Sequence, residues 1–257
     1  MTRRRWIADE FSSDRAALTG DHAAHLARTL RARVGQEFEV ACGDQVRRAT
    51  VARVAEDRVE FALGEEVAGG SVLPVTLLLA VFKFDRMEWA IEKCTELNVT
   101  NIIPVIARRT EKHLAAAAEK RVERWRRIAR EASEQSRRTA PPGIADPVKL
   151  SEALGLPTLT IAQDQSPDQC ADAGAPSGLR IVLNETEWEA SLADILQAHG
   201  NLQSLALAVG PEGGWAADEL RSFATSKWQW ISASLGETIL RAETAAIAAL
   251  AIARAAT

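Results

Sequence analysis

The sequence predicts a fold in two parts: a small, mostly β unit, followed by an α/β unit built on a parallel sheet. In residues 1–65, short segments of alternating apolar and polar residues are separated by turns that contain Gly or Asp. From Val75 onwards, apolar runs of strand length alternate with amphipathic helices. Such alternation is typical of a parallel sheet covered by helices on both faces. We therefore expect one domain at 1–70 and a second at 74–257.

In the first unit, strands are expected at Phe38–Cys42, Arg48–Ala52 and Val59–Leu63. A helix is expected in the same unit at about residues 20–33. In this helix His25, Arg28 and Arg31 recur every three residues, so we expect them to share one face. The stretch Gly64–Pro74 is expected to link the two units.

In the second unit, strands and helices are expected to alternate along the chain. The strands are Val75–Phe82, Asn101–Ile106, Leu159–Ala162, Arg180–Leu183, Leu205–Val209 and Trp228–Ser232, with a loop at 164–178. The helices are a first one that starts near Asp85, then 115–138, Trp188–His199, Ala216–Ser226 and Ala242–Ala255. Asp85 and Glu88 have the spacing of a capping box. The inward-facing stripes of the first two helices are Met87, Ala90, Ile91, Cys94 and Leu97, and Val122, Trp125, Ala129 and Ala132.

Composition and cysteine usage exclude several classes of protein. With 47% hydrophobic and 26% charged residues, the chain has the composition of a globular protein. No apolar run approaches the roughly 18–20 residues that span a bilayer. No apolar stretch follows the basic start of the chain, so we expect a cytoplasmic protein without a secretory signal. Cys42, Cys94 and Cys170 form no CxxC pair, which argues against a disulfide framework and a zinc site.

The first candidate site is the turn Gly210–Gly214, with the sequence GPEGG, which directly follows the expected strand Leu205–Val209. In an open α/β sheet, ligands bind at the carboxyl ends of the strands, and glycines there let the backbone approach a ligand closely. The turn lacks the Gly-Lys-Ser/Thr of a phosphate loop and the spacing GxGxxG. A tight connection between strand and helix explains the glycines as well as a ligand site does.

The second candidate site is Leu235–Ala245, with the sequence LGETILRAETA, which also lies between a strand and a helix. Glu243 and Thr244 would fall in the first helical turn, where backbone N–H groups and the helix dipole favour an acid or a hydroxyl. Helix capping therefore explains these two residues without a functional role. For Arg241, a cation at the carboxyl end of a strand, we find no such structural explanation.

Together the two motifs are far more specific than either alone. The order of elements is a glycine-rich turn, a helix, a strand and then Leu-Gly-x-x-Ile-Leu-Arg-x-Glu-Thr-Ala. This order resembles the C-terminal signature of the SPOUT methyltransferases, the knotted class that uses S-adenosylmethionine (AdoMet). Within this class the chain resembles the RsmE family, which methylates N3 of one uridine in bacterial 16S ribosomal RNA. The resemblance covers nearly the whole chain, and three further blocks carry it: Arg5-Trp6 with His25–Arg31, Lys83–Glu88 with Glu92–Leu97, and Arg124-Trp125 with Glu131–Pro142.

The resemblance implies a fold, a cofactor and partners. The second domain would be a SPOUT-type, trefoil-knotted parallel sheet with helices on both faces, and the first a PUA-like β-barrel that binds RNA. Two knot loops would hold AdoMet without a metal, through close backbone approach and apolar walls. The cofactor-binding residues would be Leu183, Gly210, Pro211, Glu212, Gly213, Gly214, Leu235, Gly236, Ile239 and Leu240. The partners would be the small ribosomal subunit and a second copy of the chain, which completes each site.

The implied reaction sets demands of its own. N3 of uridine carries a proton at neutral pH and attacks a methyl group well only as that proton leaves. The enzyme has to position the base and to stabilise negative charge that spreads to its carbonyl oxygens, which is a task for cations. Arg241 and Arg138 are the candidates for that task. Glu243 is the candidate general base, and attack by the minor deprotonated form of uridine is the alternative.

The basic residues are clustered, which matters more for RNA binding than the net charge of −4. A phosphate senses the local field within a Debye length of about 8–10 Å. The residues expected to bind RNA are Arg4, Arg5, His25, Arg28 and Arg31 in the first unit, and Arg137 and Arg138 at the end of the helix 115–138. Acidic residues are interleaved along the rest of that helix at spacings that suit ion pairs, so we expect a solvated face there.

Two positions depart from the family's pattern. Thr238 stands where the family usually carries Arg, and Asn98 where it usually has Gly. The missing arginine bears on RNA affinity and on the choice of target. Two other functions therefore stay open: a non-catalytic RNA-binding or ribosome-assembly factor on the same fold, and a methyltransferase for another RNA position. An ordinary nucleotide-binding enzyme would need a phosphate loop or a GxSxG-type motif, and the sequence has neither.

Overall fold

The chain forms two compact units in the computed structural model, which describes residues 5–43, 45–67, 73–156, 178–187, 189–200 and 202–256. The first unit consists of Met1–Ser71 with Arg130–Pro141, and the second of Val72–Ala129 with Pro142–Thr257. Residues 130–141 thus belong to the first unit, although they lie beyond the expected domain boundary. The expected strand Leu159–Ala162, most of the expected loop 164–178, Arg4, Cys170 and Trp188 lie outside the described residues.

The first unit is built on a six-stranded sheet with the order β1-β4-β5-β6-β3-β2. The strands are β1 (Trp6–Ile7), β2 (Glu10–Phe11), β3 (Arg15–Thr19), β4 (Glu37–Cys42), β5 (Gln45–Val54) and β6 (Arg58–Val67). β1 pairs in parallel with β4, and the other neighbours are antiparallel. Trp6, Leu18, Val40 and Phe61 are buried in its core. The three predicted strands are confirmed as β4, β5 and β6, each longer than expected.

The expected helix at 20–33 is shorter and changes its geometry. The α-helix α1 (Gly20–Ala24) continues directly into the π-helix η1 (His25–Thr29). A π-helix has wider turns than an α-helix, and its hydrogen bonds join residues five positions apart. Here Leu30 N donates to His25 O at 3.2 Å. Arg31 follows with a φ of 51°, in the left-handed region. The prediction that His25, Arg28 and Arg31 share one face is therefore wrong, because a π-helix has more residues per turn than an α-helix and Arg31 lies beyond its end.

The second unit is built on a parallel sheet, as predicted. Its strands are β7 (Val75–Ala80), β8 (Asn101–Ile106), β9 (Gly143–Ile144), β10 (Val148–Lys149), β11 (Leu179–Leu183), β12 (Leu205–Val209) and β13 (Ile231–Ala233). Their order is β10-β8-β7-β12-β11-β13, β9 also pairs with β8, and all pairings are parallel. β12 thus lies between β7 and β11, although it follows both in the chain.

Helices connect these strands. They are α2 (Phe84–Glu96), α3 (Lys112–Ala117), α4 (Val122–Gln135), α5 (Leu150–Ala153), α6 (Leu192–His199), α7 (Ala217–Thr225) and α8 (Ala242–Ala255). The single helix expected at 115–138 is divided, because the 3-10 turn η2 (Glu119–Arg121) separates α3 from α4. The inward-facing residues predicted for α4 are all buried, and so are those of α2 except for the half-buried Leu97.

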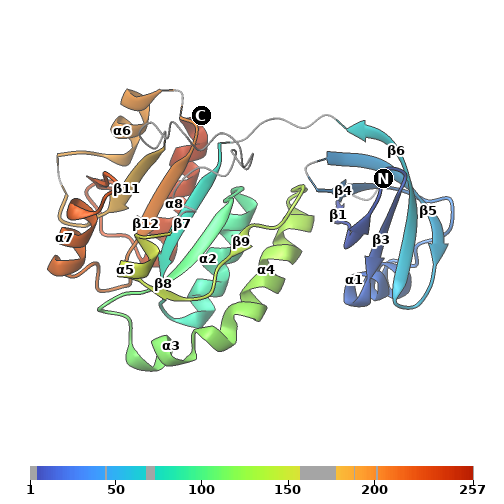
Figure 1. Ribbon diagram of the computed structural model, residues 1–257, viewed down its shortest axis with the longest axis horizontal. Helices are drawn as coiled ribbons and strands as arrows, with labels where there is room; N and C mark the ends of the chain where they lie inside the picture. Colours follow the sequence, from blue (N-terminus) through green and yellow to red (C-terminus); the bar gives the residue numbers. More distant parts are fainter. Residues whose placement is uncertain are drawn as a thin grey trace. The chain divides into compact units, whose positions relative to one another are not determined.

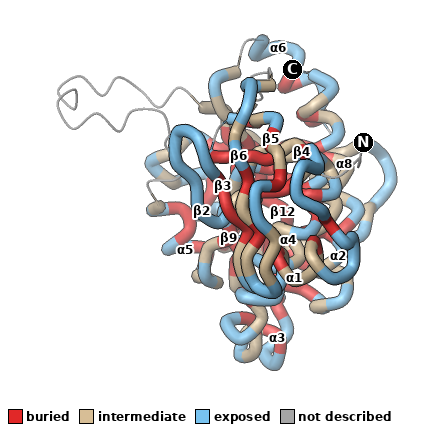
Figure 2. The backbone as a smooth tube through the Cα atoms, turned by 90° about the vertical axis from the view of Figure 1, so that its right-hand side faces the viewer, coloured by how far each residue is buried: buried red, intermediate tan, exposed pale blue. Residues whose placement is uncertain are grey.

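Helices cover both faces of the sheet, as predicted (Figure 1). Successive residues of a strand point to opposite faces, so each face has its own core. On β7, Leu77 and Leu79 share a core with residues of α2, α4, α6 and α8. Leu78 and Ala80 share the opposite core with residues of α5 and α7. Figure 2 shows the buried stretches in red, and on α3 it shows exposed residues next to the buried Leu114.

Backbone geometry decides two predictions at the ends of α2. Lys83 precedes the helix and no side chain caps it, so the expected capping box of Asp85 and Glu88 is wrong. Glu88 instead accepts two hydrogen bonds from Arg124, at 2.7 and 2.8 Å. At the other end, Asn98 has a φ of 64°, in the left-handed region that only Gly, Asn and Asp adopt readily. This conformation explains why Asn serves where the family usually has Gly.

The cysteines that the structure describes, Cys42 and Cys94, are free and buried. Burial raises the pKa of both thiols, which keeps them protonated and unreactive. Within the described ranges, no helix has the length and apolar character needed to cross a membrane. The same part of the chain holds no group of three side chains that would bind a metal ion.

Candidate active site

Three loops meet at the carboxyl edge of the parallel sheet. They are residues 184–187, 210–215 and 234–241, which follow β11, β12 and β13. These strands are neighbours and run in the same direction, so their ends lie at one edge although they are far apart in the chain. Asn184 N donates to Ala233 O at 3.0 Å and ties the first loop to the end of β13, from which the third loop begins. Open α/β sheets bind their ligands at this edge.

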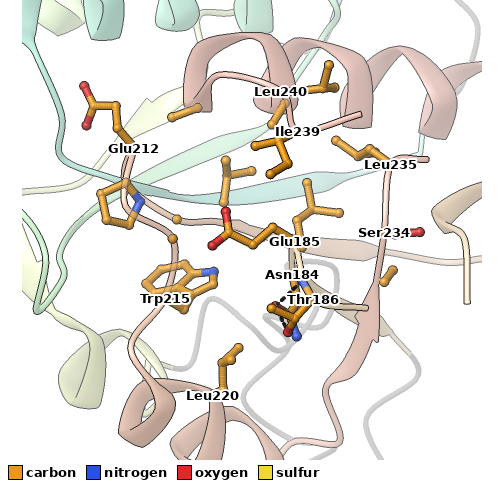
Figure 3. A pocket seen from close by; sticks show the side chains of 18 of the residues that line it. Asn184, Glu185, Thr186, Glu212, Trp215, Leu220, Ser234, Leu235, Ile239 and Leu240 are labelled. Atoms are coloured by element: carbon orange, nitrogen blue, oxygen red, sulfur yellow. Dashed lines mark hydrogen bonds between the residues drawn. The ribbon is translucent and has the colours of Figure 1, made fainter. Parts of the chain in front are cut away.

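A cavity of about 390 Å³ opens between these loops. Its volume falls in the range of roughly 300–1,000 Å³ that is typical of small-molecule sites. Figure 3 shows that side chains from all three loops surround it. The lining includes Asn184, Glu185 and Thr186 from the first loop, Gly210, Pro211, Glu212, Gly214 and Trp215 from the second, and Ser234 to Leu240 from the third.

The glycine loop after β12 approaches the cavity with its backbone. Gly214 has a φ of 70°, and its N–H donates to Pro211 O at 2.8 Å, which closes a tight turn. A Cβ on Gly214 would lie 2.7 Å from Oε1 of Glu185. A Cβ on Gly210 would lie 3.3 Å from the indole nitrogen of Trp215. A side chain at either glycine would therefore displace a group that lines the cavity.

The loop after β13 supplies apolar side chains. Gly236 has a φ of 115° and a Cβ there would meet nothing within 4 Å, so backbone conformation rather than crowding requires this glycine. Leu235 and Leu240 are half-buried, whereas Ile239 is 80% exposed. Figure 3 shows Ile239 and Leu240 on the side of the cavity opposite Trp215. An apolar ligand surface would be held between these two sides.

Asn184 fixes the loop after β11. Its Oδ1 accepts hydrogen bonds from Thr186 N at 3.1 Å and Thr186 Oγ1 at 2.9 Å, and its Nδ2 donates to Ser232 Oγ at 3.3 Å. Glu185 stands between these two fixed residues. It is exposed and makes no hydrogen bond or ion pair with another described residue. The loop thus holds an unpaired carboxylate at the cavity.

All residues predicted to bind the cofactor line the cavity except Gly213. A Cβ on Gly213 would lie 3.3 Å from Cδ of Arg109, and the guanidinium of Arg109 donates to the carbonyl oxygen of Gly213. Gly213 therefore faces Arg109 instead of the open space. Arg109 follows β8 and lines the cavity itself. No pattern in the sequence distinguishes it from the other arginines.

The three predicted catalytic residues lie in different surroundings, and none of them lines the described cavity. Arg241 is the N-cap residue of α8, and its exposed side chain has no ion pair among the described residues. Glu243 is 5% exposed, with Oε1 3.7 Å from Nε of Arg86 and Oε2 without a hydrogen-bond partner in the described part of the chain. Arg138 belongs to the first unit, where its Nε donates to Ala140 O at 3.2 Å.

Several residues predicted to bind RNA instead make contacts within the first unit. Arg5 is 15% exposed, and it donates to Glu39 at 3.0 Å and to the carbonyl oxygen of Arg137. The guanidinium of Arg137 lies 3.7 Å from the same Glu39. Arg28 is exposed but paired with Glu56. These arginines therefore stabilise the unit, and an RNA phosphate would have to compete with the acidic partners.

His25 and Arg31 differ from this group. The ring of His25 is half-buried, with its centroid 6.2 Å from that of Trp6. Arg31 is exposed and has no ion pair among the residues that the structure describes. Arg31 is thus free to meet a phosphate, whereas His25 packs against the core.

Trp215 and Glu185 are cavity residues that the sequence did not single out as functional. Trp215 is 6% exposed and its ring packs edge-on against Phe223 at 5.1 Å. Its Nε1 has no hydrogen-bond partner within the described ranges, although buried indole N–H groups usually have one. For Glu185, the signal was its position two residues after an apolar strand, at the edge where ligands bind.

Comparison with known proteins gives three findings. A family model described as an RNA methyltransferase domain matches residues 70–254. The ribosomal RNA small subunit methyltransferases E of Synechocystis sp. and Rickettsia conorii are each 31% identical to the chain over 91% of its length, which covers 71% and 87% of those proteins. The crystal structure of the Neisseria gonorrhoeae protein of the same name, bound to S-adenosyl methionine, matches with a TM-score of 0.78 and 27% identity. That match covers 96% of this chain and 95% of the other.

Proposed function

We propose a function on the premise that the chain belongs to the RsmE family of RNA methyltransferases, the ribosomal RNA small subunit methyltransferases E. The chain transfers a methyl group from AdoMet to ribosomal RNA, and its target is N3 of one uridine in 16S ribosomal RNA. The observation that carries this proposal is the cavity that the glycine loop and the loop after β13 form at the carboxyl edge of the sheet.

AdoMet, when bound, supplies a methyl group on a positively charged sulfur. Three features of the cavity fit this molecule. Its volume of about 390 Å³ suits a small ligand. A Cβ placed on Gly236 would meet nothing within 4 Å, so a flat ring can approach the backbone closely there. The buried N–H of Trp215 is left for an acceptor on the ligand.

The chain's own residues position the uridine and stabilise charge. Arg241 is the last residue of the loop after β13, directly after the residues of that loop that line the cavity, and no described acidic side chain pairs with it. Its guanidinium stabilises the negative charge on the uracil oxygens as the N3 proton leaves, and Arg138 is the second cation for this task. Glu243 is buried against Arg86 and does not line the cavity. We therefore favour attack by the deprotonated form of uridine, stabilised by a nearby arginine, over removal of the N3 proton by Glu243 as general base.

The finer features of the fold are also part of the proposal. The first unit is a PUA-like β-barrel that binds RNA, which its own core and mostly antiparallel sheet support. The second is a trefoil-knotted SPOUT domain, which the insertion of β12 between the earlier strands β7 and β11 supports. Arg31, Arg33, Arg48 and Arg53 are exposed, and their side chains are unpaired among the described residues, so phosphates can reach them.

We also propose a cytoplasmic homodimer in which the partner completes each site. Ile239 at the cavity is 80% exposed and Trp89 on α2 is 47% exposed. A partner subunit that covered these side chains would remove their apolar surface from water. Light scattering on the purified protein is expected to give twice the mass of the chain. The mass of a single chain at micromolar concentration would contradict the dimer.

One observation favours a second candidate, the same chemistry at another RNA position. Thr238 lines the cavity at the place where the family usually carries an arginine. The loss of that cation changes the surface that meets the target nucleotide. A different flanking sequence or a different base would then be selected.

Mass spectrometry of 16S ribosomal RNA from cells with and without this protein tests the proposal. We expect 3-methyluridine to disappear when the protein is absent and to return with the wild type but not with Arg241→Ala. Loss of a different methylated nucleoside would support the second candidate. If no methylated nucleoside changes and calorimetry detects no AdoMet binding, the chain is a non-catalytic RNA-binding factor.

A further inference from the structure

We infer that the cavity distinguishes the methyl donor, whose sulfur is positively charged, from the product, whose sulfur is neutral, and that Glu185 makes the distinction. The inference rests on the proposed function, since it takes AdoMet as the ligand. Methyl transfer converts a positively charged sulfonium into the neutral thioether of S-adenosylhomocysteine and leaves the rest of the molecule unchanged. A carboxylate in the cavity therefore stabilises the donor through a charge that the product lacks.

The carboxylate of Glu185 projects into the space that the ligand needs. The neighbouring residues Asn184 and Thr186 are joined by hydrogen bonds of 2.9 and 3.1 Å, which fix the backbone on both sides. The side chain reaches the glycine loop, where a Cβ on Gly214 would lie 2.7 Å from its Oε1. Figure 3 shows Glu185 pointing into the cavity, beneath Ile239 and toward the glycine loop.

The charged residues that line the cavity are mainly acidic. They are Glu185, Glu212 and Glu237, against the guanidinium of Arg109. Arg109 already donates to the carbonyl oxygen of the glycine loop. The three carboxylates form no ion pair with any described residue, so they give the fold no electrostatic stabilisation. An acidic lining is the opposite of what an RNA phosphate requires, and it suits a cationic small ligand.

A second observation concerns Trp215, which lines the cavity with an unpaired indole N–H; among the described residues, the buried indoles of Trp125 and Trp230 are unpaired too, but neither lines the cavity. Trp215 is 6% exposed and its Nε1 has no partner within the described ranges. In Figure 3 the nitrogen edge of its ring faces the cavity on the side where Glu185 lies. An acceptor on the ligand, such as a ribose hydroxyl or an adenine nitrogen, would satisfy this N–H. Donor and product share these groups, so Trp215 contributes equally to the binding of both.

Calorimetric titration with AdoMet and with S-adenosylhomocysteine tests the inference, because the ratio of the two dissociation constants isolates the charge on sulfur. Glu185→Gln keeps the shape of the side chain and removes its charge. We expect it to weaken AdoMet about fivefold, the effect of one charge pair at a solvated site, and to leave S-adenosylhomocysteine unchanged. Trp215→Phe keeps the ring packing and removes the N–H, so it should weaken both ligands by the same factor. Glu189→Gln, exposed and outside the cavity, is the matched control.

The outcomes are distinct. Equal weakening of both ligands by Glu185→Gln would overturn the inference, because Glu185 would then bind a group that donor and product share. The same holds if neither affinity changes. Raising the ionic strength should lower the preference of the wild type for AdoMet and leave that of Glu185→Gln constant. A wild-type protein that binds neither ligand would contradict the proposed function instead.

Discussion

The cavity of the α/β unit and the sheet of the first unit use their polar side chains in opposite ways. In the first unit, Glu39 holds both Arg5 and Arg137. At the cavity, Glu185 and the N–H of Trp215 have no partner among the described residues. Polar groups that are paired stabilise a fold, whereas those left unpaired at a concave surface can bind a ligand. The type of a residue is thus a weaker guide to function than the state of its hydrogen bonds.

The energies involved explain why this contrast is informative. A buried polar group without a partner costs about 1–3 kcal/mol of stability. A ligand that supplies the missing bond offsets this cost, and Trp215 lines the cavity, whereas Trp125 and Trp230, whose buried indoles are also unpaired, do not. The rest of the Trp215 ring packs against Phe223 and belongs to the core. The contrast between the two regions can be tested by substitutions in each.

The largest effect is expected for Gly214→Val. The new side chain would adopt an unfavourable φ of 70° and collide with Glu185 inside the cavity, so we expect calorimetry to detect no AdoMet binding. Gly213→Ala meets only the flexible side chain of Arg109, and a loss of affinity of at most about tenfold is expected, within the usual cost of overpacking. Gly155→Ala, outside the cavity, controls for the loss of a glycine. Equal affinities in the first two variants would contradict the geometry of the glycine loop.

The next effect is that of Arg241→Ala on turnover. Removal of a cation that stabilises charge in the transition state is expected to lower kcat on the order of 100-fold, and AdoMet affinity should stay constant because Arg241 does not line the cavity. Single-turnover methylation of the RNA measures the rate. Arg221→Ala on the exposed face of α7 is the control. An unchanged rate for Arg241→Ala would remove this residue from the mechanism.

A pair of arginine variants tests the first unit directly. Arg5→Ala breaks hydrogen bonds to Glu39 and to the carbonyl of Arg137, so we expect the free energy of unfolding to fall by about 1–3 kcal/mol. Arg31→Ala should leave the free energy of unfolding unchanged. It should make the slope of log K for RNA binding against log salt concentration less steep by about one, the contribution of one phosphate contact. Urea denaturation and filter binding at several salt concentrations measure the two quantities. If Arg31→Ala lowers the stability and Arg5→Ala lowers the salt dependence instead, our assignment of paired and free arginines is wrong.

The smallest effect is expected at Asn98, which lies outside both regions. Because its φ is 64°, Asn98→Ala should lower the free energy of unfolding by about 1 kcal/mol. Asn98→Gly relieves the same strain and should leave stability within about 0.5 kcal/mol of the wild type, since the entropy lost by glycine opposes the gain. Both variants are measured by urea denaturation. A stable Asn98→Ala protein would show that the left-handed conformation is not required.

The sequence predicts the elements that contain a long, one-sided pattern. β8, β12 and α8 have the predicted bounds, because each is a continuous run with a clear apolar signal. Strands of two residues, such as β1 and β9, contain no period that could be recognised. The lining residues that were predicted belong to the two glycine-bearing motifs that carry the family resemblance, apart from Leu183, and most of the other lining residues lie outside these motifs.

Partners of charged side chains could not be predicted, because they depend on contacts between distant parts of the chain. Arg5 is 34 residues from Glu39 and 132 residues from Arg137, and no local pattern connects them. Sequence reasoning therefore counted Arg5 as free for RNA. The change from α-helix to π-helix at His25 was equally hidden, because both geometries bury Ala23 and Leu26. Arg109 was missed because its role depends on the carbonyl of Gly213.

The composition of the first unit has a consequence for synthesis of the protein on the ribosome. Residues 130–141 belong to this unit, and residues 72–129 are translated before them. Because the nascent chain emerges in order, the N-terminal sheet has to wait for a later segment before Arg5 can reach the carbonyls of Glu134 and Arg137. The early strands and helices of the second unit are therefore outside the exit tunnel before the first unit is complete.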